Sequence, residues 1–147
     1  MKQVLFSLSA CLILMMGMPL SAQTYSMDDL VNREWKLFDD EFLSVYDLTV
    51  MMTPTQLSTT YTLKHDGHQV SGSDLFYLSV EKPTEFDSNM VGNSISGKYI
   101  VLDMSHSRSD GTVMPGDFLV VEITKLTSTE LYLKAESGHT RKYRIKQ

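Results

Sequence analysis

The residues whose types and spacing best suit metal binding lie in the segment His65–Asp66–Gly67–His68, where two histidines flank an acidic residue and a glycine. If the imidazoles faced each other across a hairpin, they could bind a metal ion together with the Asp66 carboxylate. Asp followed by Gly is also the strongest short-range signal for a tight hairpin turn, which needs the same residues and no metal. The turn is the simpler account, and we predict a hairpin here and no metal site.

Signatures of catalysis are weak elsewhere in the sequence. The stretch SHSRSDG (105–111) lacks the strand, turn and helix setting that a nucleophile motif requires, and no Gly-x-Ser-x-Gly motif occurs. The stretch GNSISGK (92–98) has the wrong spacing for a phosphate-binding loop and is interpreted as a turn. His106 and His139 adjoin loops and are interpreted as solvated polar residues. We therefore expect a protein that is not an enzyme and that needs no cofactor.

Residues 1–22 have the three parts of a secretory signal peptide. Lys2 gives a positive start, an apolar run extends from Val4 to about Leu20, and Ala22 supplies the small residue before a cleavage site. We predict cleavage between Ala22 and Gln23, with export to the periplasm or the exterior.

Two other interpretations of this segment compete with cleavage after Ala22. The first is an uncleaved membrane anchor, which would require about 20 apolar residues and basic flanking residues on the cytoplasmic side. The tetrapeptide LSAC, from Leu8 to Cys11, has the residues of a bacterial lipobox. Cleavage there would leave a very short apolar segment before Cys11, so a lipoprotein anchored through Cys11 is the alternative rather than the main prediction.

Charge and cysteine content limit the partners of residues 23–147. The chain has 13 basic and 18 acidic side chains, and loss of Lys2 with the signal would leave 12 basic ones and a net charge of −6. This acidic surplus disfavours nucleic acid as a partner. The only cysteine, Cys11, would leave with the signal, so the domain would depend on its apolar core without a disulfide. No second long apolar run follows, and we expect no stable membrane span.

The pattern after the signal begins with a short helix. Ser26 can cap a helix, and Asp28 and Asp29 favour the positive helix end. These residues predict one or two helical turns before Trp35. Beyond Trp35, apolar and polar residues alternate with the period of half-buried strands. The clearest case is TQLSTTYTLK (55–64), which places on one face Leu57, Thr59, Tyr61 and Leu63.

Several further strands and their turns indicate the architecture. SDLFYLSV (73–80) and GKYIVLDM (97–104) are apolar on both faces, which indicates strands covered on both sides or lining a cavity. HDG, TST and SGH are typical hairpin connections, and no helical segment separates the strands. Because closure removes exposed sheet edges, we predict an all-β fold, an antiparallel up-and-down β-barrel of about eight strands formed by one domain over 23–147.

The segments LVNREWKL, FLVVEITKLTSTELYLK and RKYRIK give the chain a recognisable outline. A helical turn ending in a tryptophan on the first strand, followed by this meander, resembles the small secreted lipocalin-like proteins of Gram-negative bacteria, which have calycin-like barrels. Arg33 stands where lipocalins usually carry glycine. The resemblance implies that Trp35 plugs one end of the barrel beneath an arginine of the last strand, in a cation–π contact. Arg141 lies two positions before Tyr143 and therefore on the same face of the last strand, which makes it the expected partner of Trp35. Arg144 is the second choice.

An eight-stranded barrel can be filled by its own side chains or can hold one small ligand. We expect an exported lipocalin-like binding protein that holds a small apolar or amphipathic molecule, with tyrosine hydroxyls as its polar contacts. The candidate lining residues are Met52, Tyr61, Tyr77 and Tyr99. The alternative is a filled barrel that acts through its surface or loops, as an inhibitor, an envelope component or an assembly subunit. Its contact region would be the loop SHSRSDGTVMPGD (105–117).

Overall fold

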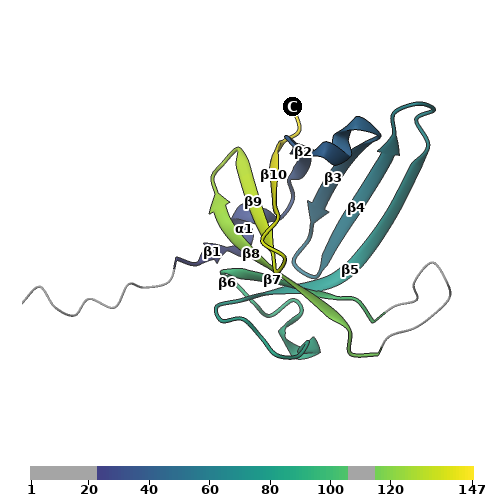
Figure 1. Cartoon of the computed structure of the whole chain (residues 1–147). Coiled ribbons are helices and arrows are strands. Elements are labelled where there is room, and N and C mark those ends of the chain that lie inside the picture. The colour runs from purple at the N-terminus through teal and green to yellow at the C-terminus, as the bar shows by residue number, and fades with distance from the viewer. Residues whose placement is uncertain (1–22, 106–114) are drawn as a thin grey trace, which may run out of the picture.

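The computed structural model describes residues 23–105 and 115–147 (Figure 1). The predicted signal segment with Cys11, and most of the proposed contact loop with His106, lie outside the described residues. The described elements are β1 (Tyr25–Ser26), α1 (Met27–Leu30), β2 (Glu34–Phe38), the 3₁₀ helix η1 (Glu41–Ser44), β3 (Tyr46–Met52), β4 (Gln56–Leu63), β5 (Gln69–Ser79), the 3₁₀ helix η2 (Ser88–Met90), β6 (Ser96–Gly97), β7 (Tyr99–Asp103), β8 (Phe118–Leu126), β9 (Glu130–Ala135) and β10 (Thr140–Ile145).

Eight of the strands form a closed barrel in the order β10-β2-β3-β4-β5-β7-β8-β9, and each neighbouring pair is antiparallel. The predicted all-β up-and-down barrel is therefore confirmed. Strands β1 and β6 pair outside it as a two-stranded sheet. The barrel closes where β10 pairs with β2, which places Ile145 opposite Trp35 and Tyr143 opposite Leu37.

The helix is a single turn, as its capping residues predict. Ser26 is the N-cap, and its Oγ accepts a hydrogen bond from the Asp28 backbone N–H at 3.3 Å. The turn ends at Val31, which is extended, and Asn32 then adopts a positive φ of 57°. A helix this short gains little from propensity alone. Its buried Met27 and Leu30 side chains anchor it against the barrel core.

The hairpin predicted at His65–His68 is confirmed, since it joins β4 to β5. Gly67 has a φ of +72°, a conformation that suits glycine, and the Asp66 carboxylate accepts a hydrogen bond from the His68 N–H at 2.8 Å. The TST and SGH segments likewise join β8 to β9 and β9 to β10.

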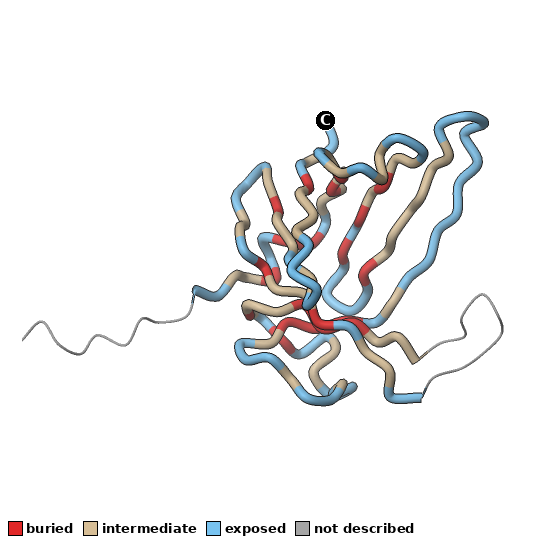
Figure 2. The backbone as a smooth tube through the Cα atoms, in the orientation of Figure 1, coloured by how far each residue is buried: buried red, intermediate tan, exposed pale blue. Residues whose placement is uncertain are grey.

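The buried side chains form two clusters on opposite faces of the sheet. Figure 2 shows the buried positions along the barrel strands and the exposed hairpin between β4 and β5. Inside the barrel lie alternate side chains such as Leu48, Val50 and Phe76. A second cluster of Tyr77, Val101 and Val120 lies on the outer face of β5, β7 and β8. The segment 80–97 covers it, contributing its own apolar side chains Phe86, Met90 and Val91. Of the two alternatives predicted for the strands that are apolar on both faces, the structure shows apolar contacts on both sides, and Leu102 of β7 also borders the interior cavity.

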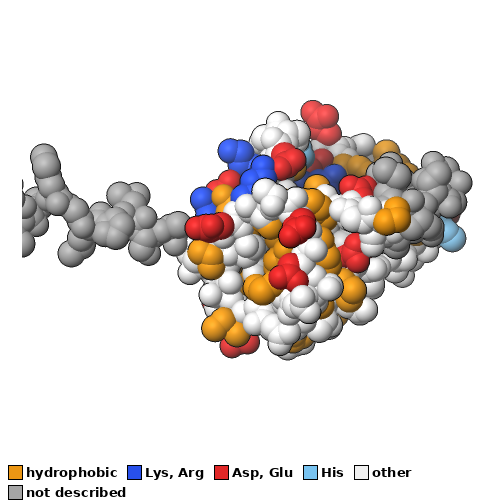
Figure 3. Space-filling view, turned by 90° about the horizontal axis from the view of Figure 1, so that it is seen from below, with side chains coloured by type: hydrophobic (Ala, Val, Ile, Leu, Met, Phe, Trp, Pro, Cys, Tyr) orange, Lys and Arg blue, Asp and Glu red, His pale blue; other side chains and the backbone are white. Residues whose placement is uncertain are grey.

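Viewed from below, the surface shows acidic and apolar side chains, with lysine and arginine gathered toward one side (Figure 3).

Candidate functional site

One end of the barrel interior is closed by the tryptophan of β2. Trp35 is fully buried, and its indole Nε1 donates a hydrogen bond to the backbone oxygen of Leu30 at 3.1 Å. Val50 on β3 and Ile145 on β10 are its register partners. Helix α1 lies against this end through Leu30, so Trp35 fastens the helical turn to the barrel.

The expected contact between Arg141 and Trp35 is wrong. Ile145, not Arg141, is paired with Trp35, and Arg141 lies four residues earlier on β10, opposite Leu133. At about 3.3 Å per residue, that offset is about 13 Å along the strand. The Arg141 Cζ instead lies 6.0 Å from the centre of the Phe42 ring.

The second choice, Arg144, does not contact Trp35 either. It is exposed and its Cζ lies 3.7 Å from the centre of the Phe38 ring, on the outer surface of the barrel. Arg144 alternates with the inward-facing Tyr143 and Ile145, so strand geometry turns it away from the interior.

Beyond the closed end, the interior holds a cavity of about 450 Å³. Its lining is mainly apolar, with polar residues on β4 and β5 (Thr59, Tyr61 and Asp74) and in the β9–β10 turn and β10 (Ser137, His139, Arg141 and Tyr143). The lining residues are Leu48, Val50, Leu57, Thr59, Tyr61, Asp74, Leu102, Met104, Leu119, Val121, Leu133, Ala135, Ser137, His139, Arg141 and Tyr143.

Of the four predicted lining residues, the structure places Tyr61 in the cavity wall. Met52 faces inward but is fully buried in the core at the Trp35 end and does not border the cavity. Tyr77 and Tyr99 are on the outer face of the barrel, so the expectation that they line the interior is wrong. The reason is alternation, because Tyr77 lies between Phe76 and Leu78, which both point inward.

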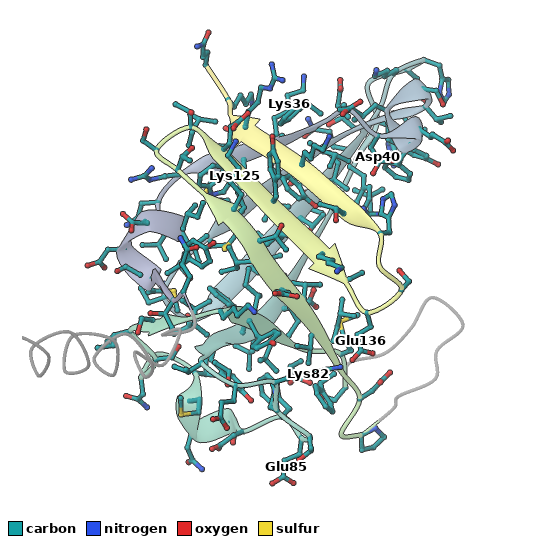
Figure 4. The ribbon with its side chains drawn as sticks, turned by 60° about the vertical axis from the view of Figure 1, so that its left-hand side comes forward. Lys36, Asp40, Lys82, Glu85, Lys125 and Glu136 are labelled. Carbon is teal, nitrogen blue, oxygen red and sulfur yellow. The ribbon has the colours of Figure 1, made fainter. Side chains whose placement is uncertain are left out.

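Tyr77 has a structural contact instead. Its hydroxyl donates a hydrogen bond to the Glu85 backbone oxygen at 3.4 Å and accepts one from the Asp87 N–H at 3.3 Å. The tyrosine therefore holds the covering segment 80–97 against the barrel wall. A salt bridge also links this segment to the β9–β10 turn, since Lys82 Nζ lies 2.5 Å from Glu136 Oε1. Figure 4 labels both residues.

A polar cluster around Asp40 joins the β2–β3 connection to the β9–β10 hairpin (Figure 4). The Asp40 Oδ1 accepts a hydrogen bond from the Phe42 N–H at 3.0 Å, and its Oδ2 lies 3.2 Å from His139 Nε2 and 3.8 Å from Arg141 Nε. The hydrogen bond from Phe42 is the main cause that lowers the pKa of Asp40, helped by His139 and Arg141 and opposed by burial. Asp40 is therefore ionised at neutral pH.

Tyr143 lies two residues beyond Arg141 on the same face of β10. Burial raises the pKa of its hydroxyl, and the positive charge of Arg141 partly opposes that rise. The hydroxyl is thus neutral at ordinary pH and can donate a hydrogen bond within the cavity.

Sequence reasoning missed the role of His139 and of Asp40. His139 is exposed, as expected of a solvated residue, but it also borders the cavity and contacts Asp40 across almost a hundred residues of sequence. Only the tertiary closure of β10 on β2 brings the two together, so no local pattern could have indicated the pair. The inward orientation of Arg141 could be predicted, because it lies two positions from Tyr143 and so on the same face of β10.

Within the described ranges 23–105 and 115–147, no group of three or more His, Cys, Asp or Glu side chains is placed to hold a metal ion. His65 Nε2 lies 2.9 Å from its neighbour Asp66. No helix in that part of the chain has the length and hydropathy needed to cross a bilayer.

Comparisons with protein-family models, with curated proteins and with solved structures give no match. The closed antiparallel barrel by itself agrees with the calycin-like architecture that the sequence resemblance implies.

Proposed function

We propose that this protein binds a small apolar or amphipathic molecule inside its barrel and does not transform it. The observation that carries the proposal is the cavity of about 450 Å³ above the Trp35 end. Small-molecule sites are concave, mostly apolar and about 300 to 1,000 Å³ in volume, with a few well-placed polar groups. The cavity has this size, this apolar wall and this sparse set of polar groups.

The residues in the wall support a cavity rather than a filled barrel. Thr59, Ala135 and Ser137 are small side chains at positions where larger ones would occupy the space. A barrel of this strand number can be filled completely when its inward residues are large. The surface-acting alternative, as an inhibitor, an envelope component or an assembly subunit, would need no such volume.

Binding can be tested with a neutral fluorescent probe, N-phenyl-1-naphthylamine, together with native mass spectrometry of the purified protein. Leu133→Trp adds a large side chain inside the cavity, whereas Lys134→Trp adds the same side chain at an exposed position on the same strand. We expect the Leu133 variant to lose at least tenfold in probe affinity, because the added indole occupies the ligand volume, and the Lys134 variant to bind like the wild type.

The binding proposal fails if the wild-type protein carries no bound mass and does not bind the probe. It also fails if Leu133→Trp and the wild type bind the probe equally. Thermal unfolding of both variants would confirm that they remain folded.

We also propose that the chain is exported after cleavage between Ala22 and Gln23, with lipidation at Cys11 as the alternative. The pattern of residues 1–22 supports export. The intact mass of the protein recovered from a bacterial periplasmic extract should correspond to a chain beginning at Gln23. A membrane-bound form that carries lipid, and that Cys11→Ser releases, would show the lipoprotein route instead.

A further inference from the structure

We propose that the cavity recognises the carboxylate of an amphiphile through Arg141, with the apolar chain directed toward the Trp35 end. This inference rests on the binding function proposed above and names the ligand class of the same cavity.

Arg141 is the positively charged anchor. Among the described residues that line the cavity, it is the only lysine or arginine. Its side chain is 42% exposed. Nε lies 3.8 Å from Asp40 Oδ2, Cζ lies 6.0 Å from the centre of the Phe42 ring, and the guanidinium also hydrogen-bonds the Tyr143 hydroxyl. A guanidinium presents five N–H donors in a planar fork, so these contacts leave donors for a carboxylate.

Asp40 does not compete for the ligand position. Its side chain is only 9% exposed and does not border the cavity. Both of its oxygens already have partners, since Oδ1 accepts from Phe42 N–H and Oδ2 faces His139 and Arg141. The group that this cluster presents to the cavity is therefore the cation and not the carboxylate.

Two tyrosine hydroxyls border the same cavity. Tyr143 follows Arg141 by two residues on the inner face of β10, and Tyr61 projects from β4. Tyr143 interacts electrostatically with Arg141 and Tyr61, and all three residues border the cavity. A phenol O–H can donate a hydrogen bond, which a carboxylate accepts and an apolar chain cannot use.

The orientation of the ligand follows from the position of Arg141 and from the apolar floor. Arg141 borders the cavity from β10, so an anionic head group is favoured on that side. The floor is apolar, because Val50 pairs with Trp35 and Leu57 pairs with Met52. An amphiphile would place its head at Arg141 and its tail among these aliphatic side chains.

A carboxylate head on an unbranched chain fits the Arg141 guanidinium and the two tyrosine hydroxyls that border the cavity.

The test compares two ligands of equal chain length, decanoate and 1-decanol, by displacement of N-phenyl-1-naphthylamine. We expect the wild type to bind decanoate at least tenfold more tightly than the alcohol. Because a hydrogen bond to a charged group contributes more than a neutral one, Arg141→Gln should weaken decanoate binding about tenfold to a hundredfold. Decanol affinity should change less than about threefold, which also shows that the variant cavity is intact.

Arg144→Gln is the matched control, because Arg144 lies on the same strand but outside the barrel over Phe38. It should leave both affinities unchanged. Arg141→Lys should retain part of the preference for decanoate, since the charge remains while the planar fork is lost.

The outcomes separate this inference from the proposed function. If decanol and decanoate bind the wild type equally, or if Arg141→Gln weakens both ligands alike, the carboxylate site is wrong and the binding function stands. If neither ligand nor the probe binds the wild type, both proposals are wrong.

Discussion

At one end of the barrel interior, the strands enclose Trp35, Met52 and Leu131, each essentially without exposed surface. At the other end, the same strands enclose Thr59, Tyr61 and Ala135 around an open volume of about 450 Å³. The strands are continuous from one end to the other, so the difference does not come from the fold. It comes from side-chain volume, since the inward positions carry large side chains at one level and small or polar ones at the next.

This contrast teaches that stability and binding can occupy separate levels of one barrel. The packed end buries the apolar surface that offsets chain entropy. The open end leaves apolar wall exposed, which costs stability but provides a surface for a ligand. Substitutions at the two ends should therefore have different consequences, and three experiments would break or sharpen the comparison.

The largest effect is expected at the closed end, for Trp35→Ala. The change removes a fully buried indole and leaves the Leu30 carbonyl oxygen without its hydrogen bond. Large-to-small changes of buried aromatic residues cost about 3–5 kcal/mol, and urea unfolding should show a loss of that size. Lys36→Ala, at the next position, removes only an exposed ion pair with Asp47 and should cost about 0.5 kcal/mol or less. A loss below 1 kcal/mol for the tryptophan variant would contradict the assignment of this end as the core.

A closer comparison uses two leucines on the same face of β9. Leu131 is fully buried in the same core cluster as Trp35, whereas Leu133, two residues along, borders the cavity. Leu131→Ala should reduce the free energy of unfolding by about 2–5 kcal/mol. Leu133→Ala should cost about 1 kcal/mol, because part of its surface already faces open space. Equal losses in chemical denaturation would mean that the two levels are packed alike and that the cavity does not persist in solution.

The smallest effect is expected at the open end, for Asp40→Asn. The pKa of Asp40 is lowered from 3.8, chiefly by the hydrogen bond from Phe42, so the folded protein binds the ionised form more tightly than the unfolded chain does. That stabilisation is present above the unfolded pKa and is lost as the pH falls through the lower folded value. The variant should lose about 1 kcal/mol or less at pH 7, and the difference should shrink as the pH falls below 3.8.

The control for that measurement is Asp39→Asn. Asp39 is largely exposed, pairs with Lys142 on the surface, and has a positive φ of 58° that asparagine also tolerates. Unfolding free energies of the wild type and both variants across pH 2.5 to 7 would test the effect. A stability difference that grows on acidification would contradict the assignment of an ionised Asp40.

The barrel could be predicted from the sequence because its strands alternate cleanly. In β4, polar residues separate Leu57, Thr59 and Tyr61, so the inward face is readable and Tyr61 was placed correctly. The strands β5 and β7 lack such alternation, because the segment 80–97 covers their outer face with its own apolar side chains. A residue covered by a distant segment looks the same as one inside the barrel, and this is why Tyr77 was misplaced.

Arg141 shows a second limit. The alternation of side chains along β10 gave the correct face for Arg141, but it does not say how far along the barrel axis the residue lies. The level depends on the register of β10 against β2, which pairs Ile145 with Trp35. Asp40 and His139 could not be predicted as a pair, since they meet only through that same long-range closure.

The seam between β2 and β10 has a consequence for how folding can be watched. It pairs residues 35–38 with residues 142–145, whereas every other strand pair of the barrel joins successive strands of the barrel along the chain. Contacts between residues so distant in sequence are slow to form, because the loop-closure entropy must be lost before they stabilise anything. The chain's single tryptophan lies on this seam. Its fluorescence should therefore report the late closing of the barrel as a separate kinetic phase, without any added label.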